Sequence, residues 1–400
     1  MRVLLAHNFY RSAAPSGEDV VYRAERSLLE AKGVEVIAFE RSNDTIDDST
    51  LAKRLRLARD TAWSKSTYAA LSELIGRTRP DVAHFHNTFP LMSPSGYAAC
   101  RHHGVPVVQT LHNFRLLCSN ALLLRDGRPC EDCVGKSLWP ALLHRCYRGS
   151  LSATAAVVWM LFSNRRRGTY QELVDRYVAP TRFAAGRLVG GGLPRGRVTV
   201  KPNFIPDPPP PGRGRGHYAV YVGRLTPEKG VRTLLDAWAI AAPLPLKVVG
   251  DGVLRSELEE RARQQRLPVE FLGFRPRDEV LRIVSDAAFV VAPSQCYETF
   301  SMAVVEAYAC GTPVVASRLG SLDEAVIEGE TGLKFEASNP HDLAAKVRTL
   351  VANPARLGDM RRRARMVFEE NYTAEKNYAA LLAIYGQVAA RRAPGERAAN

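Results

Sequence analysis

The chain has 400 residues, of which 46% are hydrophobic and 24% are charged. This composition is typical of folded soluble proteins and excludes a disordered, collagen-like or disulfide-scaffold chain, and the length predicts two or three domains at about 150 residues each. The net charge is +14, and most of it lies within 51–203, where 23 lysines and arginines accompany 8 acidic residues. Such a surface favours phosphorylated substrates, acidic lipids or nucleic acid as partners, although a merely solubilising surface explains the same charge.

We expect neither a secretory signal nor a membrane-spanning helix. The apolar start of the sequence turns polar after His7. The longest stretch without a charged residue or a histidine, Gly149 to Asn164, has 16 residues, whereas about 20 are needed to span a bilayer. We therefore expect a cytoplasmic protein, soluble or peripheral on the inner face of the membrane, whose seven cysteines are thiols or metal ligands rather than disulfides.

Short apolar runs alternate with helical stretches through the first half of the chain. A helix is expected over 19–32, where apolar residues recur near a 3.6-residue period. Strands that alternate with helices form a parallel sheet with helices on both faces. The expected strands of this sheet are 3–6, 34–39, 82–85, 105–111, 177–179 and 198–200.

A proline- and glycine-rich segment separates the two halves. Residues 206–216 read PDPPPPGRGRG, which predicts a linker that is stiff and then flexible. The alternation then resumes, so the chain is expected to form two doubly wound α/β domains, 1–204 and 217–371, joined by a linker over 205–216. Ligands of such sheets bind beyond the carboxyl ends of the strands. The elements expected in the second domain are strands 218–222, 246–249, 269–272, 288–291 and 313–316 and helices 231–240 and 255–265.

Two loops of the second half are suited to binding an anion. The segment Gly223 to Gly230, GRLTPEKG, follows a strand and opens a helix, where unpaired backbone amides attract negative charge. Arg224 and Lys229 flank this turn and could hold a diphosphate, whereas a surface turn with two solvated cations is the alternative. The weaker Gly250-Asp-Gly252 segment permits a tight turn and a close backbone approach.

The strongest motif contains two glutamates, Glu298 in a loop and Glu306 in the following helix. Glu306 is embedded in an apolar run and looks buried, and an unpaired buried carboxylate is costly. A carboxylate in this position can accept two hydrogen bonds from a diol such as a ribose. Two ordinary surface glutamates are the alternative. The backbone amides expected to point toward an anion are those of Phe300, Ser301 and Met302.

In combination, these motifs resemble the nucleotide-sugar domain of the retaining family-4 glycosyltransferases of GT-B fold, the glycosyltransferase group 1 type. Pro15-Ser-Gly17 is similar to the family's N-terminal glycine-rich loop, and Lys201-Pro-Asn203 precedes the linker. A helix over 372–390, followed by a tail over 391–400, resembles the family's helix that crosses back onto the first domain. The resemblance implies two Rossmann-like domains facing across a cleft.

The resemblance also implies where the donor, a nucleoside diphosphate sugar, would bind. Arg224 and Lys229 would bind the diphosphate, and Gly17 would approach it from the first domain. Glu306 would accept the ribose hydroxyls. The remaining donor-binding residues implied by the resemblance are Gly223, Gly250, Gly252, Phe300, Ser301 and Met302.

The resemblance places further residues at the transferred sugar. Glu298 and the amides of 300–302 would hold this sugar and its phosphate, and His112 resembles the family's active-site histidine, although a histidine satisfied at a strand end is the alternative. Ser301 replaces the usual glycine after the phenylalanine, and Ser16 replaces the first of two N-terminal glycines. Both departures leave the identity of the sugar open. The implied catalytic residues are His112, Glu298, Arg224 and Lys229.

The implied reaction moves a sugar from a UDP or GDP sugar to a hydroxyl acceptor with retention, in bacterial glycan, polysaccharide or glycolipid assembly. Stabilisation of the diphosphate leaving group by two cations would dominate. Because no Asp-x-Asp motif is present, no catalytic divalent metal is expected. The alternatives are a sugar epimerase or phosphorylase on the same fold, and a non-catalytic protein that binds anionic lipid or nucleic acid. Since the latter leaves the paired glutamates unexplained, no nucleic acid partner is expected.

Residues 113–170 form an insert with two notable features. Cys130 and Cys133 form a Cys-x2-Cys knuckle after an Asp-Gly hairpin turn, and two further cysteines allow a structural zinc site, with four reduced thiols as the alternative. The apolar stretch 151–162 runs into 165–167, three arginines, which suits an anionic membrane interface or a buried helix with solvated arginines. The tentative zinc ligands are Cys118, Cys130, Cys133 and Cys146, with His144 as a spare.

Overall fold

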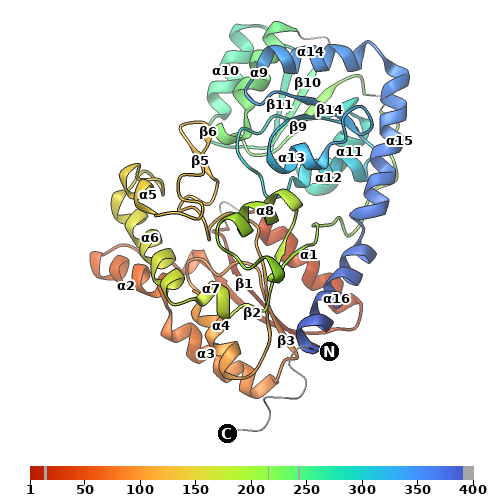
Figure 1. The fold of residues 1–400 in the computed structure, drawn as a ribbon. Helices are drawn as coiled ribbons and strands as arrows, with labels where there is room; N and C mark the ends of the chain where they lie inside the picture. Colours follow the sequence, from red (N-terminus) through yellow and green to blue (C-terminus); the bar gives the residue numbers. More distant parts are fainter. Residues whose placement is uncertain (13–15, 215, 242–243, 391–400) are drawn as a thin grey trace. The chain divides into compact units, whose positions relative to one another are not determined.

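The structure is a computed structural model that describes the chain except for residues 13–15, 215, 242–243 and 391–400 (Figure 1). The predicted tail over 391–400 and Pro15 of the predicted glycine-rich loop therefore lie outside the described residues. The chain divides into two compact units. Unit 1 contains 1–122, 131–202 and 377–400, and unit 2 contains 123–130 and 203–376. Each unit holds one six-stranded sheet.

The sheet of unit 1 is entirely parallel, with the order β2-β1-β3-β4-β7-β8. Val3 of β1, which is next to the edge strand β2, pairs with Val36 on one side and with Val82 on the other. Strand β1 is buried on both faces, as parallel strands covered by helices usually are. The strands are β1 (Arg2–Phe9), β2 (Glu35–Ser42), β3 (Val82–Phe85), β4 (Val107–Thr110), β7 (Arg176–Ala179) and β8 (Val198–Val200).

The first helix of unit 1 begins with a capping box between Ser16 and Asp19, which accounts for its start at Gly17. At the other end of the chain, Tyr385 and its neighbours in the last helix pack against Val3 in the core of this unit, which confirms the predicted return helix. The helices are α1 (Gly17–Ala31), α2 (Leu51–Ala62), α3 (Lys65–Thr78), α4 (Ser95–His102), α5 (Trp139–Leu143), α6 (Leu151–Arg166), α7 (Thr169–Glu172), α8 (Arg182–Gly190) and α16 (Ala374–Ala390), with short 3-10 turns η1 (Asn43–Thr45) and η2 (Arg195–Arg197).

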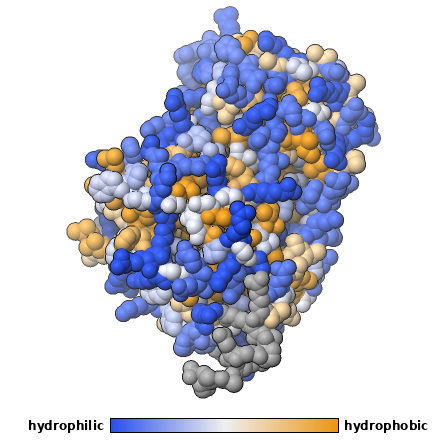
Figure 2. All heavy atoms as spheres, viewed as in Figure 1, coloured by the Kyte–Doolittle hydropathy of each residue, from blue (hydrophilic) through white to orange (hydrophobic). Residues whose placement is uncertain are grey.

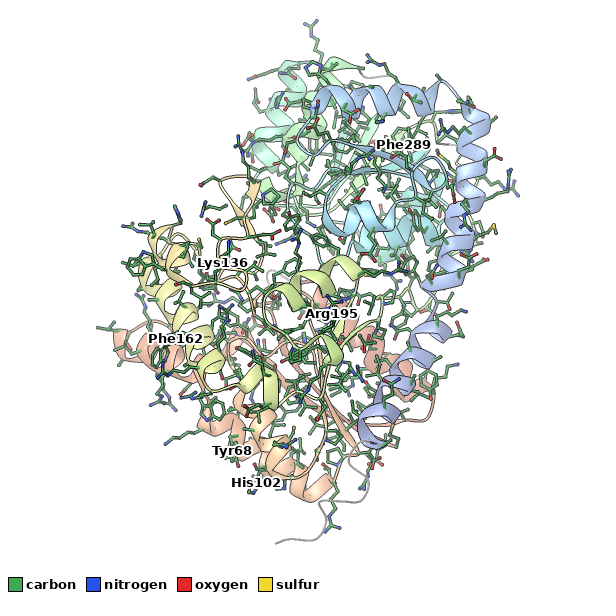
Figure 3. All side chains as sticks on the ribbon, viewed as in Figure 1. Tyr68, His102, Lys136, Phe162, Arg195 and Phe289 are labelled. Carbon is green, nitrogen blue, oxygen red and sulfur yellow. The ribbon has the colours of Figure 1, made fainter. Side chains whose placement is uncertain are left out.

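The sheet of unit 2 is also parallel, with the order β11-β10-β9-β12-β13-β14. Phe289 on β12 is fully buried in its core (Figure 3). The strands are β9 (Ala219–Val222), β10 (Leu246–Val249), β11 (Val269–Gly273), β12 (Phe289–Ala292), β13 (Val314–Ser317) and β14 (Gly332–Phe335), the last of which was not predicted. The helices are η3 (Pro227–Lys229), α9 (Val231–Ile240), α10 (Arg255–Gln264), α11 (Arg277–Asp286), α12 (Met302–Ala309), α13 (Gly320–Ala325), α14 (Pro340–Val351) and α15 (Pro354–Asn371).

The segment 205–216, predicted to be a linker that is stiff and then flexible, forms hydrogen bonds with unit 2. The amide of Gly212 donates a hydrogen bond to the carbonyl of Cys310 at 2.8 Å. The guanidinium of Arg365 donates to the carbonyl of Pro209 at 2.9 Å. The described part of this segment is therefore attached to unit 2, because proline-rich backbone still offers carbonyl groups that side chains and amides can bind.

The insert contains the predicted hairpin. Leu124–Arg125 (β5) pairs with Arg128–Pro129 (β6) around the two-residue turn Asp126-Gly127, both of whose residues have positive φ. The surface of the molecule is mostly hydrophilic in the view of Figure 2, with apolar side chains gathered over α2 and α5. Within the described residues, none of the helices combines the length and apolar character required to cross a bilayer.

Candidate active site

Two loops of unit 2 meet at the carboxyl ends of β9 and β12. The strand order reverses between these strands, which is where open α/β sheets bind ligands. At Gly230 a Cβ would lie only 1.9 Å from the carbonyl oxygen of Pro293, and the φ of 70° also favours glycine. The amide of Gln295 donates to the carbonyl of Glu228 at 2.9 Å. Close backbone approach therefore fixes the two predicted donor loops against each other.

The loop after β10 joins them, as the glycines of the Gly250-Asp-Gly252 segment predicted. A Cβ on Gly250 would lie 2.0 Å from the carbonyl oxygen of Gly223. The amide of Leu225 donates to the carbonyl of Asp251 at 2.9 Å. The three loops of unit 2 that sequence patterns single out thus form one continuous surface at the carboxyl end of the sheet.

Lys229 and Glu298 form an ion pair between these loops. The ammonium nitrogen of Lys229 lies 2.8 Å from Oε1 of Glu298, and the hydroxyl of Ser294 donates to the same oxygen. Burial alone would lower the pKa of Lys229, but the Glu298 carboxylate raises it above the ordinary lysine value. The ammonium group is therefore charged at every ordinary pH, and it is held at the edge of the loops where an anion could share it.

Arg224 is placed differently from Lys229. Its side chain is 65% exposed, and its guanidinium lies 3.4 Å from the carboxylate of Glu228. The hydroxyl of Thr226 donates to the same carboxylate at 2.7 Å. An exposed guanidinium with one long ion pair can turn toward a bound anion at little energetic cost.

Glu306 lies on α12, among the apolar residues that the sequence predicted. Burial raises the pKa of its carboxyl group to about 7, with the cation of Arg277 acting in the opposite direction. Among the residues that the structure describes, none is seen to donate a hydrogen bond to this carboxyl group. A half-buried carboxyl group of this kind is stabilised by a ligand that brings hydroxyl donors.

The amides predicted to bind phosphate lie at the start of the same helix. Ser301 is the N-cap of α12, and its side chain forms no capping hydrogen bond with the first turn. First-turn amides without a side-chain cap remain suited to an anion. The ring of Phe300 packs 6.1 Å from that of Tyr372, which fixes the loop ahead of the helix.

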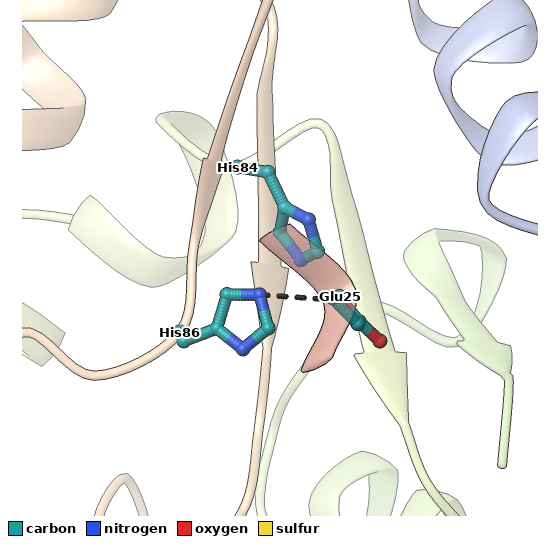
Figure 4. A group of neighbouring side chains, drawn as sticks. All are labelled: Glu25, His84 and His86. Carbon is teal, nitrogen blue, oxygen red and sulfur yellow. Dashed lines mark ion pairs between the residues drawn. The ribbon is translucent and has the colours of Figure 1, made fainter. Parts of the chain in front are cut away.

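In unit 1, His112 belongs to a chain of polar groups that the sequence did not reveal. Figure 4 shows three other members of the surrounding cluster, Glu25, His84 and His86. Nε2 of His112 lies 3.0 Å from Nδ1 of His86, and Nε2 of His86 lies 3.3 Å from the Glu25 carboxylate. The ammonium of Lys201 donates to the other carboxylate oxygen at 2.5 Å. Both members of this last pair are almost fully buried.

The charges of this network follow from the contacts. Burial alone would raise the pKa of Glu25, but Lys201 and His86 hold it well below the usual value. Burial, reinforced by the nearby imidazole of His86, holds the pKa of His112 well below that of free histidine. His112 is therefore neutral at neutral pH, while Glu25 and Lys201 form a buried ion pair.

Glu25, His84 and His86 are close enough together to suggest a metal site, with ligand atoms within 4.8 Å of one another. Two observations argue against it. Lys201 already neutralises the carboxylate through one of its oxygens, and its ammonium group would repel a divalent cation bound beside it. Both ring nitrogens of His84 are also engaged at 2.7 Å, one by Tyr385 and one by Thr110. The cluster is therefore suited to holding protons and orienting side chains.

A second carboxyl group of unit 1 lies beside the predicted glycine loop. Glu18 is buried at the start of α1, and its carboxylate accepts from the amide of Asn113 at 2.6 Å. Burial raises the pKa of Glu18 to about 7, although the hydrogen bond from Asn113 acts in the opposite direction. Glu18 was not among the site residues predicted from the sequence, although its place between Gly17 and the capping residue Asp19 is a signal that could have identified it. A Cβ added at Gly17 would meet no atom within 4 Å. The described surroundings therefore do not require a glycine there, and its predicted role in donor binding stays a prediction.

The structure does not gather the four cysteines of the predicted zinc site. Among the described residues, the only group of metal-binding side chains with ligand atoms within 4.8 Å is the one that contains Glu25, whereas zinc with four thiolates requires four sulfurs at about 2.3 Å from one ion. Cys133 is instead buried in an apolar cluster with Cys146 packed against it, and Cys118 donates to Asn120. None of the seven cysteines takes part in a disulfide. The structure thus favours the alternative of reduced cysteines.

Two family profiles match the sequence in succession. Glycosyltransferase Family 4 matches residues 18–207, and Glycosyl transferases group 1 matches residues 209–367. The first match contains His112 and the second contains Lys229, Glu298 and Glu306. The boundary between them lies close to that between the two units.

Among curated proteins, an uncharacterized glycosyltransferase of Methanocaldococcus jannaschii is 38% identical over 141 residues, which covers 35% of this chain and 40% of that protein. D-inositol 3-phosphate glycosyltransferase 1 of Catenulispora acidiphila is 30% identical over 311 residues, which covers 70% of this chain and 66% of that protein. The chain thus spans two fifths of the first relative and about two thirds of the second.

Among solved structures, sucrose-phosphate synthase from Thermosynechococcus elongatus aligns with a TM-score of 0.71 at 19% identity, over 98% of this chain and 100% of that chain. Anabaena HepE in complex with UDP aligns with a TM-score of 0.67 at 17% identity, over 96% of this chain and 100% of that chain. At such low identity, this likeness establishes the fold of two Rossmann-like units.

Proposed function

Because the chain belongs to the family-4, group 1 glycosyltransferases of GT-B fold, we propose that it transfers a glycosyl group from a nucleoside diphosphate sugar to a hydroxyl acceptor with retention at the anomeric carbon. The observation that carries this proposal is the Lys229–Glu298 pair at the point where the sheet of unit 2 reverses its strand order. This position combines a fixed cation, a carboxylate and a helix N-terminus.

The diphosphate binds at Lys229, Arg224 and the first turn of α12. As the bond between the sugar and the diphosphate breaks, negative charge grows on the diphosphate. Fixed cations and helix amides stabilise such charge without reorganisation during the reaction. Arg224 turns from its exposed position onto the phosphate, whereas Lys229 is already held in place by Glu298.

The nucleoside is held by Glu306. Its carboxyl group accepts two hydrogen bonds from the ribose hydroxyls, which compensate for the cost of its ionisation in a buried position. The base is not fixed by these residues. Anabaena HepE was solved with UDP, and a Mycobacterium tuberculosis relative 35% identical over 189 residues is named a GDP-mannose-dependent mannosyltransferase. We therefore propose a UDP or GDP sugar as the donor.

We propose that His112 of unit 1 takes part in the reaction as a neutral imidazole. Since Nε2 of His112 lies beside Nδ1 of His86, its tautomer is set by that hydrogen bond. A neutral, fixed imidazole can hydrogen-bond a sugar hydroxyl, and it adds no positive charge that would oppose a developing sugar cation. A hydroxyl of a glycan or of a lipid-linked sugar is the proposed acceptor.

Calorimetric titration with UDP, GDP, ADP and dTDP tests the donor site, with Glu306→Ala and Lys229→Ala in parallel. One nucleotide should bind the wild type and lose affinity in both variants. Anomeric NMR analysis of the product then tests retention. A protein that binds anionic lipid or RNA but none of the four nucleotides would instead support the non-catalytic alternative. Turnover of the donor with no new glycosidic bond would support an epimerase.

A further inference from the structure

Three neighbouring helices of unit 1 carry an exposed apolar surface. We call it the α2–α5–α6 surface. Helices α2 and α5 both pack on α6 through a buried cluster that includes Ala62, Ala141 and Leu161. Figure 2 shows apolar side chains on the outer side, over α2 and α5. The large apolar residues of this surface, each between 51% and 73% exposed, are Leu51, Leu55, Trp139, Leu143, Leu151, Trp159 and Phe162.

Helix α6 is apolar on both its inner and its outer face. Leu151, Ala155, Trp159 and Phe162 follow one another at intervals of four, four and three residues, so they share one exposed face. Phe162 points outward from α6 in Figure 3, and its ring lies 6.5 Å from that of Trp159. The opposite face of the helix is buried in the core of the insert. The outer face is therefore unpartnered, and core packing does not account for its tryptophan and phenylalanine.

Basic side chains are interspersed with these apolar ones. On α2, an open hollow of about 530 Å³ is lined by Ala52, Leu55, Arg56 and Arg59. Asp60 pairs with both arginines, and its carboxylate is the acidic group that opposes them. Positive charge still dominates, because α2, α5 and α6 together contain six basic residues and one acidic residue, Asp60. The other exposed cations of the surface are Lys53, Arg54, Arg145, Arg148 and Arg166.

The three arginines that the sequence suggested as a membrane anchor are not equivalent. The guanidinium of Arg165 donates to the carbonyl of Leu116 at 2.9 Å, and burial lowers its pKa. Arg167 lies over the ring of Trp63 at 5.1 Å. Arg166 is exposed and, among the described residues, makes no such contact. The surface that could contact a membrane is therefore broader than the arginine run, and its centre lies on the apolar faces of α2, α5 and α6.

We propose that the α2–α5–α6 surface binds the interface of an anionic lipid bilayer. Tryptophan, phenylalanine and leucine enter the boundary between headgroups and acyl chains, and the surrounding arginines contact lipid phosphates. A second copy of the chain is a poorer partner, because two surfaces of the same strong positive charge repel each other. Nucleic acid would explain the charge but not seven exposed large apolar side chains. The proposal does not depend on the donor site in unit 2.

Vesicle co-sedimentation tests this proposal directly. The probes are phosphatidylcholine vesicles and vesicles that also contain about 30% phosphatidylglycerol, each at low and high salt. The wild type should bind the anionic vesicles, and salt should weaken the binding. Trp159→Ser/Phe162→Ser should bind at least about tenfold more weakly. Because both side chains are exposed, this variant should keep the melting temperature and the nucleotide affinity of the wild type.

A matched control comes from unit 2, where Val253 and Phe274 are 82% and 77% exposed. Val253→Ser/Phe274→Ser removes a similar exposed apolar area and should bind vesicles like the wild type. Arg56→Gln/Arg59→Gln should lose binding to anionic vesicles and much of its salt dependence. Equal binding by Trp159→Ser/Phe162→Ser and the wild type would overturn the proposal, as would a wild type that ignores anionic vesicles. Nucleotide binding in the same samples reports separately on the donor site.

Discussion

Nδ1 of His86 lies 3.0 Å from Nε2 of His112, and the other nitrogen of His86 lies 3.3 Å from the carboxylate of Glu25. The Glu25 carboxylate favours a proton on the nitrogen of His86 that faces it. With the proton there, Nδ1 of His86 would accept a hydrogen bond from Nε2 of His112. Glu25, which is held by Lys201, is thus linked to His112 through His86.

We expect Glu25→Gln to destabilise the protein strongly. The change leaves the buried ammonium of Lys201 without its counter-ion, and breaking a buried pair from one side costs about 3–5 kcal/mol. Glu25→Gln/Lys201→Met should recover most of the loss, because it removes both charges. Denaturant unfolding of the two variants measures the difference. If the single change were no more harmful than the double change, the buried pair would not have the assigned role.

Lys229→Ala should lower kcat/KM by about a hundredfold or more, because it removes a fixed cation from the leaving group. The stability loss should be small, since the side chain is partly exposed and only one ion pair is lost. Steady-state kinetics and thermal melting together measure both effects. Arg232→Ala is a suitable control, because that arginine forms an exposed ion pair with Glu257 and has no assigned role at the donor. Equal kinetic losses in both variants would contradict the assignment.

Donor binding should strengthen as the pH rises through about 7. Burial raises the pKa of Glu306 to about 7 in the folded protein, whereas the ordinary value is 4.5. The protonated form is therefore favoured in the fold, so its contribution to stability is full below about pH 4.5 and is lost as the pH rises through 7. The ribose hydroxyls donate hydrogen bonds to the ionised carboxylate of Glu306. In the complex, these bonds compensate for the stability that is lost when Glu306 ionises.

Titration calorimetry between pH 5.5 and 8.5 checks this linkage. The affinity should fall up to about tenfold per pH unit well below the pKa. Glu306→Gln cannot ionise, and its weaker binding should lose the pH dependence that belongs to this carboxyl group. A variant with the full wild-type pH profile would assign the titration to another group, of which Glu18 is the first candidate.

Chelation should leave the melting temperature unchanged. The cysteines of the insert form no disulfide, and the structure brings no three of the four together around one point. Overnight treatment with EDTA, followed by thermal melting and elemental analysis, measures any structural metal. A loss of stability on chelation, together with one zinc per chain before it, would restore the zinc prediction.

The positions of the three loops singled out in unit 2 could be predicted because each motif is local. Gly223 to Gly230 is contiguous, and Glu298 and Glu306 are eight residues apart. Parallel strands then bring the loops together at one end of the sheet, which is a property of the topology. The ion pair between Lys229 and Glu298 follows from that topology, although the sequence did not specify it.

The network of unit 1 could not be predicted in the same way. Lys201 lies 176 residues from Glu25, and Tyr385 lies 301 residues from His84. A single glutamate or lysine gives no indication of so distant a partner. The one local signal was the pair of histidines at 84 and 86 on a strongly apolar strand, where alternate residues share a face. Strand β14 was missed because it is short and begins at a glycine.

The return of α16 to unit 1 has a consequence for how the protein is made. Tyr385 hydrogen-bonds His84 at the centre of the first sheet, and Leu381 packs there with Val3. On a ribosome, the first unit therefore emerges long before the helix that completes its core, while unit 2 is synthesised in between. The first sheet must wait with part of its apolar surface uncovered, which is when nascent chains associate wrongly or recruit chaperones. Unit 2, contained almost entirely within 203–376, can complete its core first.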